Sequence, residues 1–188
     1  MKAIKNLGAI AAIIILSVLV GLFAQFLTGA LDKKQHPRQF CEYVEEYSEE
    51  FRVPEAIIYA VIKCESSFDS AAVSSAGAIG LMQLMPDTFA YLCTKLGDDY
   101  ETGMLYDPKT NIRYGTYYLS MLYERFGIWE TVFAAYNCGP SRVNGWIEEG
   151  KVTDSGRLSE IPIAGTAHYV EKVQKAADTY EELYYTEK

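Results

Sequence analysis

The chain contains 188 residues, which is enough for one domain and a short appendage. Its formal net charge is −8; residues 1–38 carry +4, and the remainder of the chain therefore carries −12. A domain this acidic argues against nucleic acid as a partner and against binding of the domain itself to an anionic membrane surface. An acidic surface also keeps a protein soluble, so the charge alone indicates no function.

The first predicted element is an N-terminal membrane segment over residues 1–31. Lys2 and Lys5 precede an uncharged stretch, from Asn6 to Leu31, that is dense in aliphatic residues. About 20 such residues span a bilayer core, whereas the apolar region of a cleaved signal peptide has about 7–15 residues. We therefore expect an uncleaved transmembrane helix, with a cleaved signal segment as the alternative.

A polar tether over residues 32–39 is expected to lead into a helical domain over residues 40–188. Near its start, Phe40, Val44 and Tyr47 form an apolar stripe with glutamates mostly on the opposite face. Pro54 suits the first turn of a second helix, which runs to Glu65. Residues 70–85 are rich in small residues and predict a loop, with at most a small β element near residues 74–83.

The rest of the chain predicts helices joined by polar connections. They are expected from Pro86 to near Gly97, from Asp107-Pro108 to near Gly127, and over residues 129–137, 141–148 and 166–184. Residues 151–160 read as a polar loop. The expected fold class is therefore all-α.

Cysteine spacing gives no indication of a metal site. Cys41, Cys64, Cys93 and Cys138 form no Cys-x-x-Cys pair and have no histidine at zinc-ligand distance. We expect neither a metal nor another cofactor. Outside the cell, disulfides are possible, with three connectivities if all four cysteines pair. Four buried free thiols that act as small hydrophobic side chains are the alternative.

The most informative single residue is Glu65. Ile58, Ile62 and Glu65 share one helix face, so the carboxyl group continues an apolar stripe. Burial there would raise its pKa, as a general acid that works near neutral pH requires. An isolated Glu in the last turn of a helix is more often a solvent-facing residue, so its interpretation depends on the neighbouring motifs.

Three motifs occur in order along the chain. They are Glu65-Ser66-Ser67-Phe68, the run from Gly77 to Pro86 (GAIGLMQLMP), and Ala134 to Pro140 (AAYNCGP). Together they resemble the soluble lytic transglycosylase family of the lysozyme-like superfamily, which cuts peptidoglycan glycan strands. The resemblance covers roughly residues 40–182. It implies a compact helical lysozyme-like domain with minor α+β character, and peptidoglycan glycan strands as the partner.

The resemblance implies Glu65 as the single general acid/base. Glu65 would protonate the oxygen between N-acetylmuramic acid and N-acetylglucosamine, and then take a proton from the muramoyl C6 hydroxyl to leave a 1,6-anhydro end. Ordinary glycoside hydrolases use two carboxylates. Here we expect Asp69 to be a loop residue and Asp87 a first-turn residue of a helix. Because peptidoglycan lies outside the membrane, the domain is expected to be extracytoplasmic, or secreted if the N-terminal segment is cleaved.

The resemblance also implies substrate contacts. The candidates are Ser74, Gly80, Met82, Gln83, Tyr136, Asn137 and Tyr169. Ser74 could equally be a turn serine, Gly80 a plain turn glycine and Met82 core filler.

Three of these candidates carry a more specific expectation. Gln83 is expected to face the glycan or brace Glu65. The hydroxyl of Tyr136 is expected to point at Glu65 or at a sugar N-acetyl group, and Asn137 is expected to hold the loop that follows it.

One segment departs from the family pattern. Gly165 stands where the family has Glu, and Ala167 stands where Arg is common, although Tyr169 still matches a cleft tyrosine. His168 is expected on the helix surface. Two alternatives to a transglycosylase therefore stay open: a lysozyme-type hydrolase, and a weakly active peptidoglycan-binding component of a cell-envelope assembly. The sequence names no protein partner.

Overall fold

The computed structural model describes residues 16–23, 28–29 and 31–186, and the chain divides into two units, residues 1–37 and 38–188. Most of the predicted membrane segment lies outside the described residues. Among the residues that are described, none belongs to a helix with the length and apolar character needed to cross a membrane. The second unit holds the candidate site.

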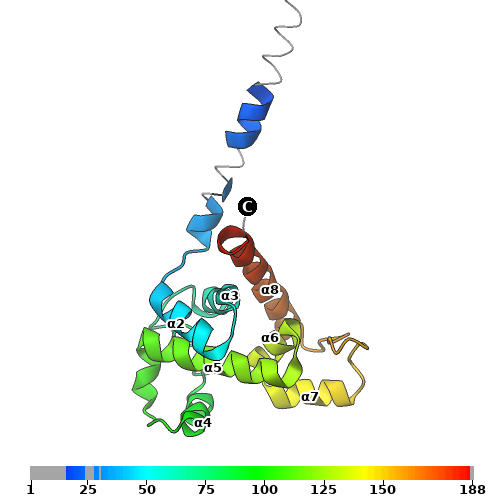
Figure 1. Ribbon diagram of the computed structural model, residues 1–188. Helices are drawn as coiled ribbons and strands as arrows, with labels where there is room; N and C mark the ends of the chain where they lie inside the picture. Colours follow the sequence, from blue (N-terminus) through cyan, green and yellow to red (C-terminus); the bar gives the residue numbers. More distant parts are fainter. Residues whose placement is uncertain (1–15, 24–27, 30, 187–188) are drawn as a thin grey trace, which may run out of the picture. The chain divides into compact units, whose positions relative to one another are not determined.

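Residues 38–186 form a helical domain (Figure 1). Its elements are α2 (Cys41–Phe51), α3 (Glu55–Ser66), α4 (Pro86–Leu96), the 3-10 helix η1 (Thr102–Tyr106), α5 (Pro108–Phe126), α6 (Trp129–Cys138), α7 (Pro140–Glu148) and α8 (Ala164–Tyr184). The all-α prediction is confirmed. Two differences are the unpredicted helix η1 and the start of α8, which begins two residues earlier than expected.

Proline and glycine set several of these helix boundaries. Pro86 and Pro108 occupy the first positions of α4 and α5, where a missing N–H removes no helical hydrogen bond. Gly97 and Gly127 end the same two helices in the left-handed conformation, with φ of 75° and 70°. At the start of α5, the Asp107 carboxylate accepts a hydrogen bond from the Thr110 N–H at 2.8 Å.

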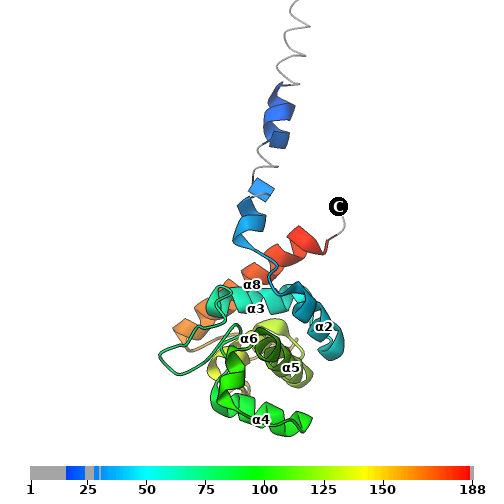
Figure 2. The ribbon, with the colours of Figure 1, turned by 90° about the vertical axis from the view of Figure 1, so that its left-hand side faces the viewer.

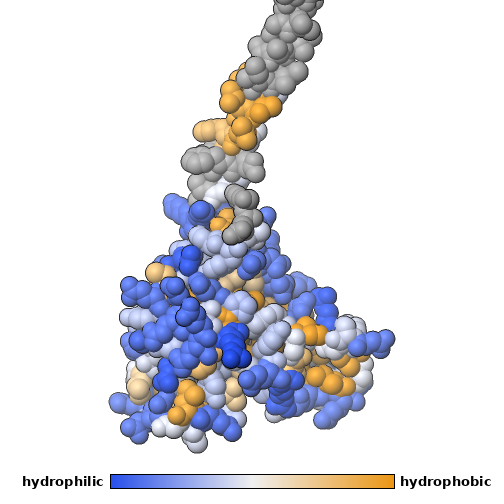
Figure 3. All heavy atoms as spheres, in the orientation of Figure 1, coloured by the Kyte–Doolittle hydropathy of each residue, from blue (hydrophilic) through white to orange (hydrophobic). Residues whose placement is uncertain are grey.

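Helix α3 runs through the core of the domain. Every residue from Ala56 to Ile62 is buried, so the helix is covered on all sides and not along one stripe alone. Helix α8 packs along α3, and Figure 2 shows the two helices side by side above α5 and α6. Polar side chains cover most of the face of residues 38–186 seen in Figure 3.

The loop after α3 is fixed by one buried side chain from α5. The Asn111 Oδ1 atom accepts a hydrogen bond from the Met82 N–H at 2.8 Å, and its Nδ2 atom donates to the carbonyl oxygens of Ile79 and Leu105 at 2.9 and 2.8 Å. Gly80 has φ of 82° and lies so close to Asn111 and Leu105 that no Cβ atom fits. The expected β element consists of isolated bridges, Val73–Ile79 and Ile79–Leu84.

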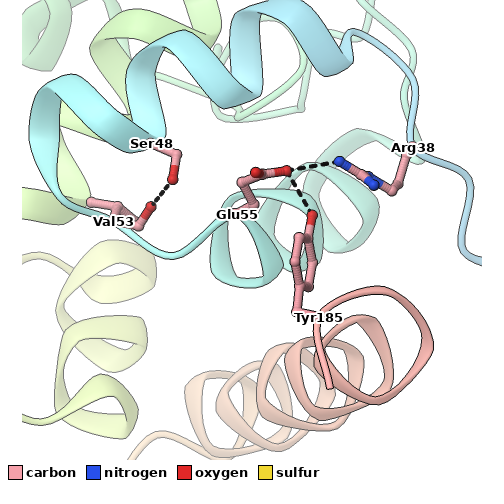
Figure 4. A network of polar contacts seen from close by, with 5 residues as sticks. All are labelled: Arg38, Ser48, Val53, Glu55 and Tyr185. Carbon is pink, nitrogen blue, oxygen red and sulfur yellow. Dashed lines mark hydrogen bonds and ion pairs between the residues drawn. The ribbon is translucent and has the colours of Figure 1, made fainter. Parts of the chain in front are cut away.

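A polar cluster joins the start of the domain to its last helix (Figure 4). Arg38 forms an ion pair with Glu55 at 3.0 Å, and the Tyr185 hydroxyl donates to the same carboxylate at 2.7 Å. The rings of Tyr59, Tyr184 and Tyr185 surround the Arg38 guanidinium, with centroids 5.3–5.7 Å from its central carbon. We call these five residues the Arg38 clasp.

A second contact drawn in Figure 4 closes the connection between α2 and α3. The Ser48 hydroxyl donates a hydrogen bond to the Val53 carbonyl oxygen at 2.7 Å. This bond fixes the turn that directs the chain into α3.

The four cysteines are free thiols. Cys93 is buried, Cys64 and Cys138 are half-buried and Cys41 is exposed, so the alternative of four buried free thiols holds in full for Cys93, in part for Cys64 and Cys138, and not for Cys41. Burial raises the pKa of the Cys64 thiol to about 11, which keeps it protonated beside Glu65.

Candidate active site

Glu65 lies in the last turn of α3, directly after the fully buried Ile58 and Ile62 on the same face. Its carboxyl group is half-buried, and its Oε1 atom accepts a hydrogen bond of 2.6 Å from the Tyr169 hydroxyl on α8. Burial raises the pKa of Glu65. The Tyr169 hydrogen bond and the charge of Lys172 lower this pKa, but their effect is smaller, so the pKa stays above the ordinary value. The carboxyl group therefore holds its proton at higher pH than an exposed glutamate does.

Two tyrosines stand near Glu65 and have different partners. The Tyr136 hydroxyl donates to the Met82 carbonyl oxygen at 2.8 Å and not to Glu65, and its expected contact with a sugar N-acetyl group stays a prediction. The hydroxyl that contacts Glu65 belongs to Tyr169. Burial, and then the charge of Glu65, raises the pKa of Tyr136 and of Tyr169 far above the ordinary value, so both remain neutral donors.

A pocket of about 240 Å³ lies between the end of the loop over residues 70–85, which we call the Gly-rich loop, and Tyr136 and Asn137 at the end of α6. It is lined by Gln83, Leu84, Met85, Thr88, Tyr118, Tyr136, Asn137, Cys138 and Gly139. Sequence reasoning missed Met85, Thr88 and Tyr118 as lining residues. The first two carried a usable signal, because they are three residues apart at the start of α4 and lie two and five residues after Gln83.

A larger pocket, of about 350 Å³, lies at the start of α5 and is lined by other charged side chains. Its Asp98 pairs with Arg113 at 2.8 Å and accepts a hydrogen bond from the Tyr114 hydroxyl at 2.6 Å. Its Asp107 caps α5. Asp98 and Asp107 are committed to structural contacts, and Asp99, the third carboxylate of this pocket, is exposed, which makes Glu65 the better candidate for proton transfer.

The loop candidates brace the wall of the site. The Ser74 hydroxyl accepts a hydrogen bond from the Ala78 N–H at 3.0 Å within its own turn. The Gln83 amide nitrogen donates to the carbonyl oxygens of Ala72 and Gly80 at 3.1 and 3.0 Å, so its nitrogen braces the loop and not Glu65. Met82 is fully buried, as the core-filler alternative expects, and packs against Gly115 of α5.

Asn137 joins the end of α6 to the start of α8. Its Oδ1 atom accepts a hydrogen bond of 2.8 Å from the Thr166 hydroxyl, one turn before Tyr169. The neighbouring Gly165 is exposed in the first turn of α8, and a Cβ atom there would meet no other group within 4 Å. A side chain at position 165 is therefore sterically acceptable.

The two other acidic candidates near the motifs have the structural roles that the sequence predicts. The Asp69 carboxylate accepts a hydrogen bond from the Ala71 N–H at 2.9 Å, which closes a turn. Asp87 lies in the first turn of α4, where a negative charge suits the helix dipole. Glu65 is thus the carboxyl group whose surroundings favour the proton-bound form.

Comparisons with known proteins identify the family of this chain. The family model described as "Transglycosylase SLT domain" matches residues 42–156. The soluble lytic murein transglycosylase of Escherichia coli strain K12 is 33% identical over 154 residues, which cover 79% of this chain and 24% of that protein. The membrane-bound lytic murein transglycosylase C of Serratia proteamaculans is 28% identical over 189 residues, which cover 88% of this chain and 52% of that protein.

Solved structures give the same result. An inactive mutant of the lytic transglycosylase Slt from Pseudomonas aeruginosa superposes with a TM-score of 0.70 at 33% identity, over 78% of this chain and 24% of its own. A 70-kDa soluble lytic transglycosylase in complex with bulgecin A superposes with a TM-score of 0.76 at 28% identity, over 83% and 26%. The chain thus spans about a quarter of the soluble relatives and about half of the Serratia protein. By its family-model match and its fold, the chain belongs to the transglycosylase SLT domain family, with a helical lysozyme-like fold.

Proposed function

We propose that this protein is a peptidoglycan lytic transglycosylase that uses Glu65 as its only general acid and base. The observation that carries the proposal is the half-buried Glu65 carboxyl group, which has a raised pKa and a single short hydrogen bond from the neutral Tyr169 hydroxyl. The similarity to lytic transglycosylases supports our assignment of the β-1,4-linked glycan strand as the substrate.

The reaction proceeds by two proton transfers through the same carboxyl group. Glu65 first gives its proton to the glycosidic oxygen between N-acetylmuramic acid and N-acetylglucosamine, and the bond to the muramoyl C1 atom breaks. The substrate N-acetyl group stabilises the cationic centre at C1. The Glu65 carboxylate then removes the proton of the muramoyl C6 hydroxyl, whose oxygen bonds to C1 and closes the 1,6-anhydro ring.

Tyr169 serves both halves of this cycle. Its hydroxyl orients the protonated carboxyl group for the first step. It also stabilises the carboxylate that exists between the two steps, because a hydrogen bond to an ionised group is stronger than a neutral one. Glu65 does not line the pocket along Gln83, Tyr136 and Asn137, but the charge of Glu65 acts on Tyr136, so this pocket is suited to hold a sugar ring next to the site of proton transfer.

The decisive experiment is mass analysis of the products released from purified peptidoglycan by wild type and by Glu65→Gln. We expect 1,6-anhydro ends from wild type and a loss of at least about 10²–10⁴-fold in the variant, the range typical of general acid–base catalysis. Reducing ends would identify a hydrolase of the lysozyme type, and binding without products would identify a component that only binds the wall. Appreciable turnover by the variant would exclude the single-acid mechanism.

Asp69→Asn is the matched control, since it neutralises a nearby carboxylate that only closes a turn. It should leave turnover close to that of wild type. Glu65→Gln should also melt at least as high as wild type at neutral pH, because a half-buried carboxylate destabilises the fold above its own pKa. A lower midpoint would mean that lost activity reflects lost structure.

We further propose that residues 1–31 hold the protein at the cell membrane, that residues 32–39 act as a tether, and that the domain works on the extracytoplasmic side. The uncharged stretch from Asn6 to Leu31 and the membrane-bound relative support this location. Fractionation of the full chain beside a chain that starts at residue 32 tests it. Recovery of the full chain in the soluble fraction would argue for cleavage or for no anchoring.

A further inference from the structure

A lysine outside the family motifs contacts the turn that carries Glu65. Lys172 lies on α8, three residues after Tyr169, and the two side chains therefore share one face of the helix. The Lys172 Nζ atom donates a hydrogen bond of 3.0 Å to the carbonyl oxygen of Cys64, the residue before Glu65. One face of α8 thus contacts the Glu65 turn twice: the neutral Tyr169 hydroxyl binds the Glu65 carboxyl group, and the Lys172 ammonium group binds the Cys64 carbonyl oxygen.

The end of α3 gives this contact a physical role. The last four carbonyl groups of an α-helix have no partner within the helix, and together they carry the negative end of the helix dipole. Ser67 N–H bonds to the Lys63 carbonyl at 3.2 Å, and Lys172 supplies the donor for Cys64, the next carbonyl. A lysine at such a position caps the helix and offsets its dipole.

On the basis of the proposed function, we propose that Lys172 is a positioning residue of the same site: it holds the last turn of α3 against Tyr169, and its positive charge stabilises the Glu65 carboxylate that exists between the two proton transfers.

Of the groups that face Glu65, Lys172 supplies the positive charge. From α8 come Tyr169 and Lys172, and from α6 comes Tyr136; both tyrosines stay neutral. On α3 itself, the Cys64 thiol is protonated. Among the described residues, Lys172 is the charged side chain that acts on the titration of Glu65, and it does so against burial.

The charge of Lys172 also acts on Lys63, another residue of α3. Burial lowers the pKa of Lys63, and the charge of Lys172 lowers it further. The two positive charges therefore repel each other near the end of α3, and the negative end of the helix dipole offsets this repulsion.

The charge has opposite effects on the two chemical steps. A nearby cation lowers the pKa of Glu65, which disfavours the protonated form that begins the reaction. Once Glu65 has given its proton away, the same cation stabilises the partly desolvated carboxylate until it receives the C6 hydroxyl proton. Lys172 thereby balances the acid step against the base step of one carboxyl group.

The test compares Lys172→Met, which removes the charge and the donor, with Lys172→Arg, which retains both. The form that begins the reaction is protonated, so kcat/KM falls as pH rises through the Glu65 pKa. In Lys172→Met this descending limb should move up by about 0.5–1 pH unit, a shift discounted for the exposed side chain, and kcat should fall several-fold. Lys172→Arg should keep the wild-type limb, and so should Lys175→Met, an exposed lysine one turn onward.

A direct titration separates this inference from the proposed function. The chemical shift of the ¹³C-labelled Glu65 carboxyl carbon reports its pKa in the intact protein without any substrate. A higher pKa in Lys172→Met but not in Lys172→Arg would support the inference even if wild type released no product, an outcome that would refute only the proposed function. An unmoved limb and an unmoved pKa in a folded Lys172→Met, or equal shifts in both variants, would overturn the inference.

Discussion

At Glu65, opposing effects act on one carboxyl group. Burial at the end of α3 raises its pKa, whereas the Tyr169 hydroxyl and the Lys172 charge lower it, and burial has the largest effect. If burial acted alone, the proton would be held too firmly to leave; if the donors acted alone, Glu65 would be ionised like an exposed glutamate. The balance gives an acid that can also serve as a base.

Replacing Tyr169 by Phe should change this balance in a defined direction. The variant removes the 2.6 Å hydrogen bond that favours the carboxylate, so the Glu65 pKa should rise by about one unit, as the loss of a charge-assisted hydrogen bond implies. The descending limb of kcat/KM should move to higher pH by the same amount, with lower turnover at every pH. Tyr123→Phe, a change in an exposed ring, should leave the profile unchanged.

A pH–rate profile of Tyr169→Phe that coincided with that of wild type would contradict this role for the Tyr169 hydroxyl. A shift to lower pH would contradict the sign of the argument.

Gly165→Glu should raise turnover, or at least not lower it. The position is exposed, its backbone is not in the left-handed region and a Cβ atom meets no neighbour, so strain does not oppose the change. The resemblance to the family, whose members have Glu at this position, implies a carboxylate in the cleft, and a negative charge near Glu65 would favour its protonated form. Replacing a helical glycine and adding a negative charge to the first turn of α8 should also stabilise the fold by about 1 kcal/mol.

Activity and thermal midpoint are measured beside those of Gly165→Ala, which changes helix propensity without adding a carboxylate. A clear loss of activity in Gly165→Glu at an unchanged midpoint would mean that the glycine is an adaptation of this cleft.

The single residues that sequence reasoning located best were those inside contiguous motifs. Glu65 and Tyr136 were selected in this way. Tyr169 and Met82 were also selected, but not as the hydrogen-bond partners of Glu65 and Tyr136. Tyr169 reaches Glu65 across 104 residues of sequence, and Tyr136 reaches the Met82 carbonyl across 54. No local pattern contains such distances, because they arise only when α8 packs on α3 and α6 packs near the loop.

At the level of elements, local sequence signals set the helix boundaries, and packing between helices determined which helix faces are buried. Pro86, Pro108, Gly97 and Gly127 mark helix ends in the sequence and in the structure. The extent of α3 burial was not visible, because a stripe pattern cannot show that neighbouring helices cover the other faces as well. Helix η1 is too short to produce a periodic pattern.

The Gly-rich loop should be sensitive to one added methyl group. Gly80→Ala would force an unfavourable φ and displace the buried Asn111 amide, so we expect a loss of about 2–4 kcal/mol of unfolding free energy. Chemical denaturation measures it. The matched control is Gly145→Ala in α7, where a Cβ atom has open space and higher helix propensity should be neutral or stabilising.

Equal stability of Gly80→Ala and wild type would show that the loop can move away from α5 without cost. The role assigned to Asn111 would then be wrong.

For the molecule as a whole, the Arg38 clasp bears on where the folded part begins. A fragment of residues 38–188 retains Arg38, whereas a fragment of residues 40–188 loses its ion pair and its contacts with three aromatic rings. Both should give helical circular dichroism, and the shorter should be less stable by about 1–2 kcal/mol. Arg38→Met in the longer fragment should reproduce the loss.

Thermal and urea midpoints of the three proteins provide the measurement. Identical midpoints would mean that the clasp forms without adding stability, and an insoluble longer fragment would argue against independent folding of residues 38–188.

The clasp also fixes where the chain enters and leaves the domain. Arg38 is the first residue of its unit, and Tyr185, one residue past the end of α8, lies against its guanidinium group at 5.3 Å. A domain whose two ends meet can be inserted into a longer polypeptide without separating the segments that flank it. This geometry suits a domain that corresponds to about a quarter of its soluble relatives, because other segments can be added on either side of it. Glu65 lies at the opposite end of α3 from the clasp residue Glu55, so such additions leave the surroundings of Glu65 unchanged.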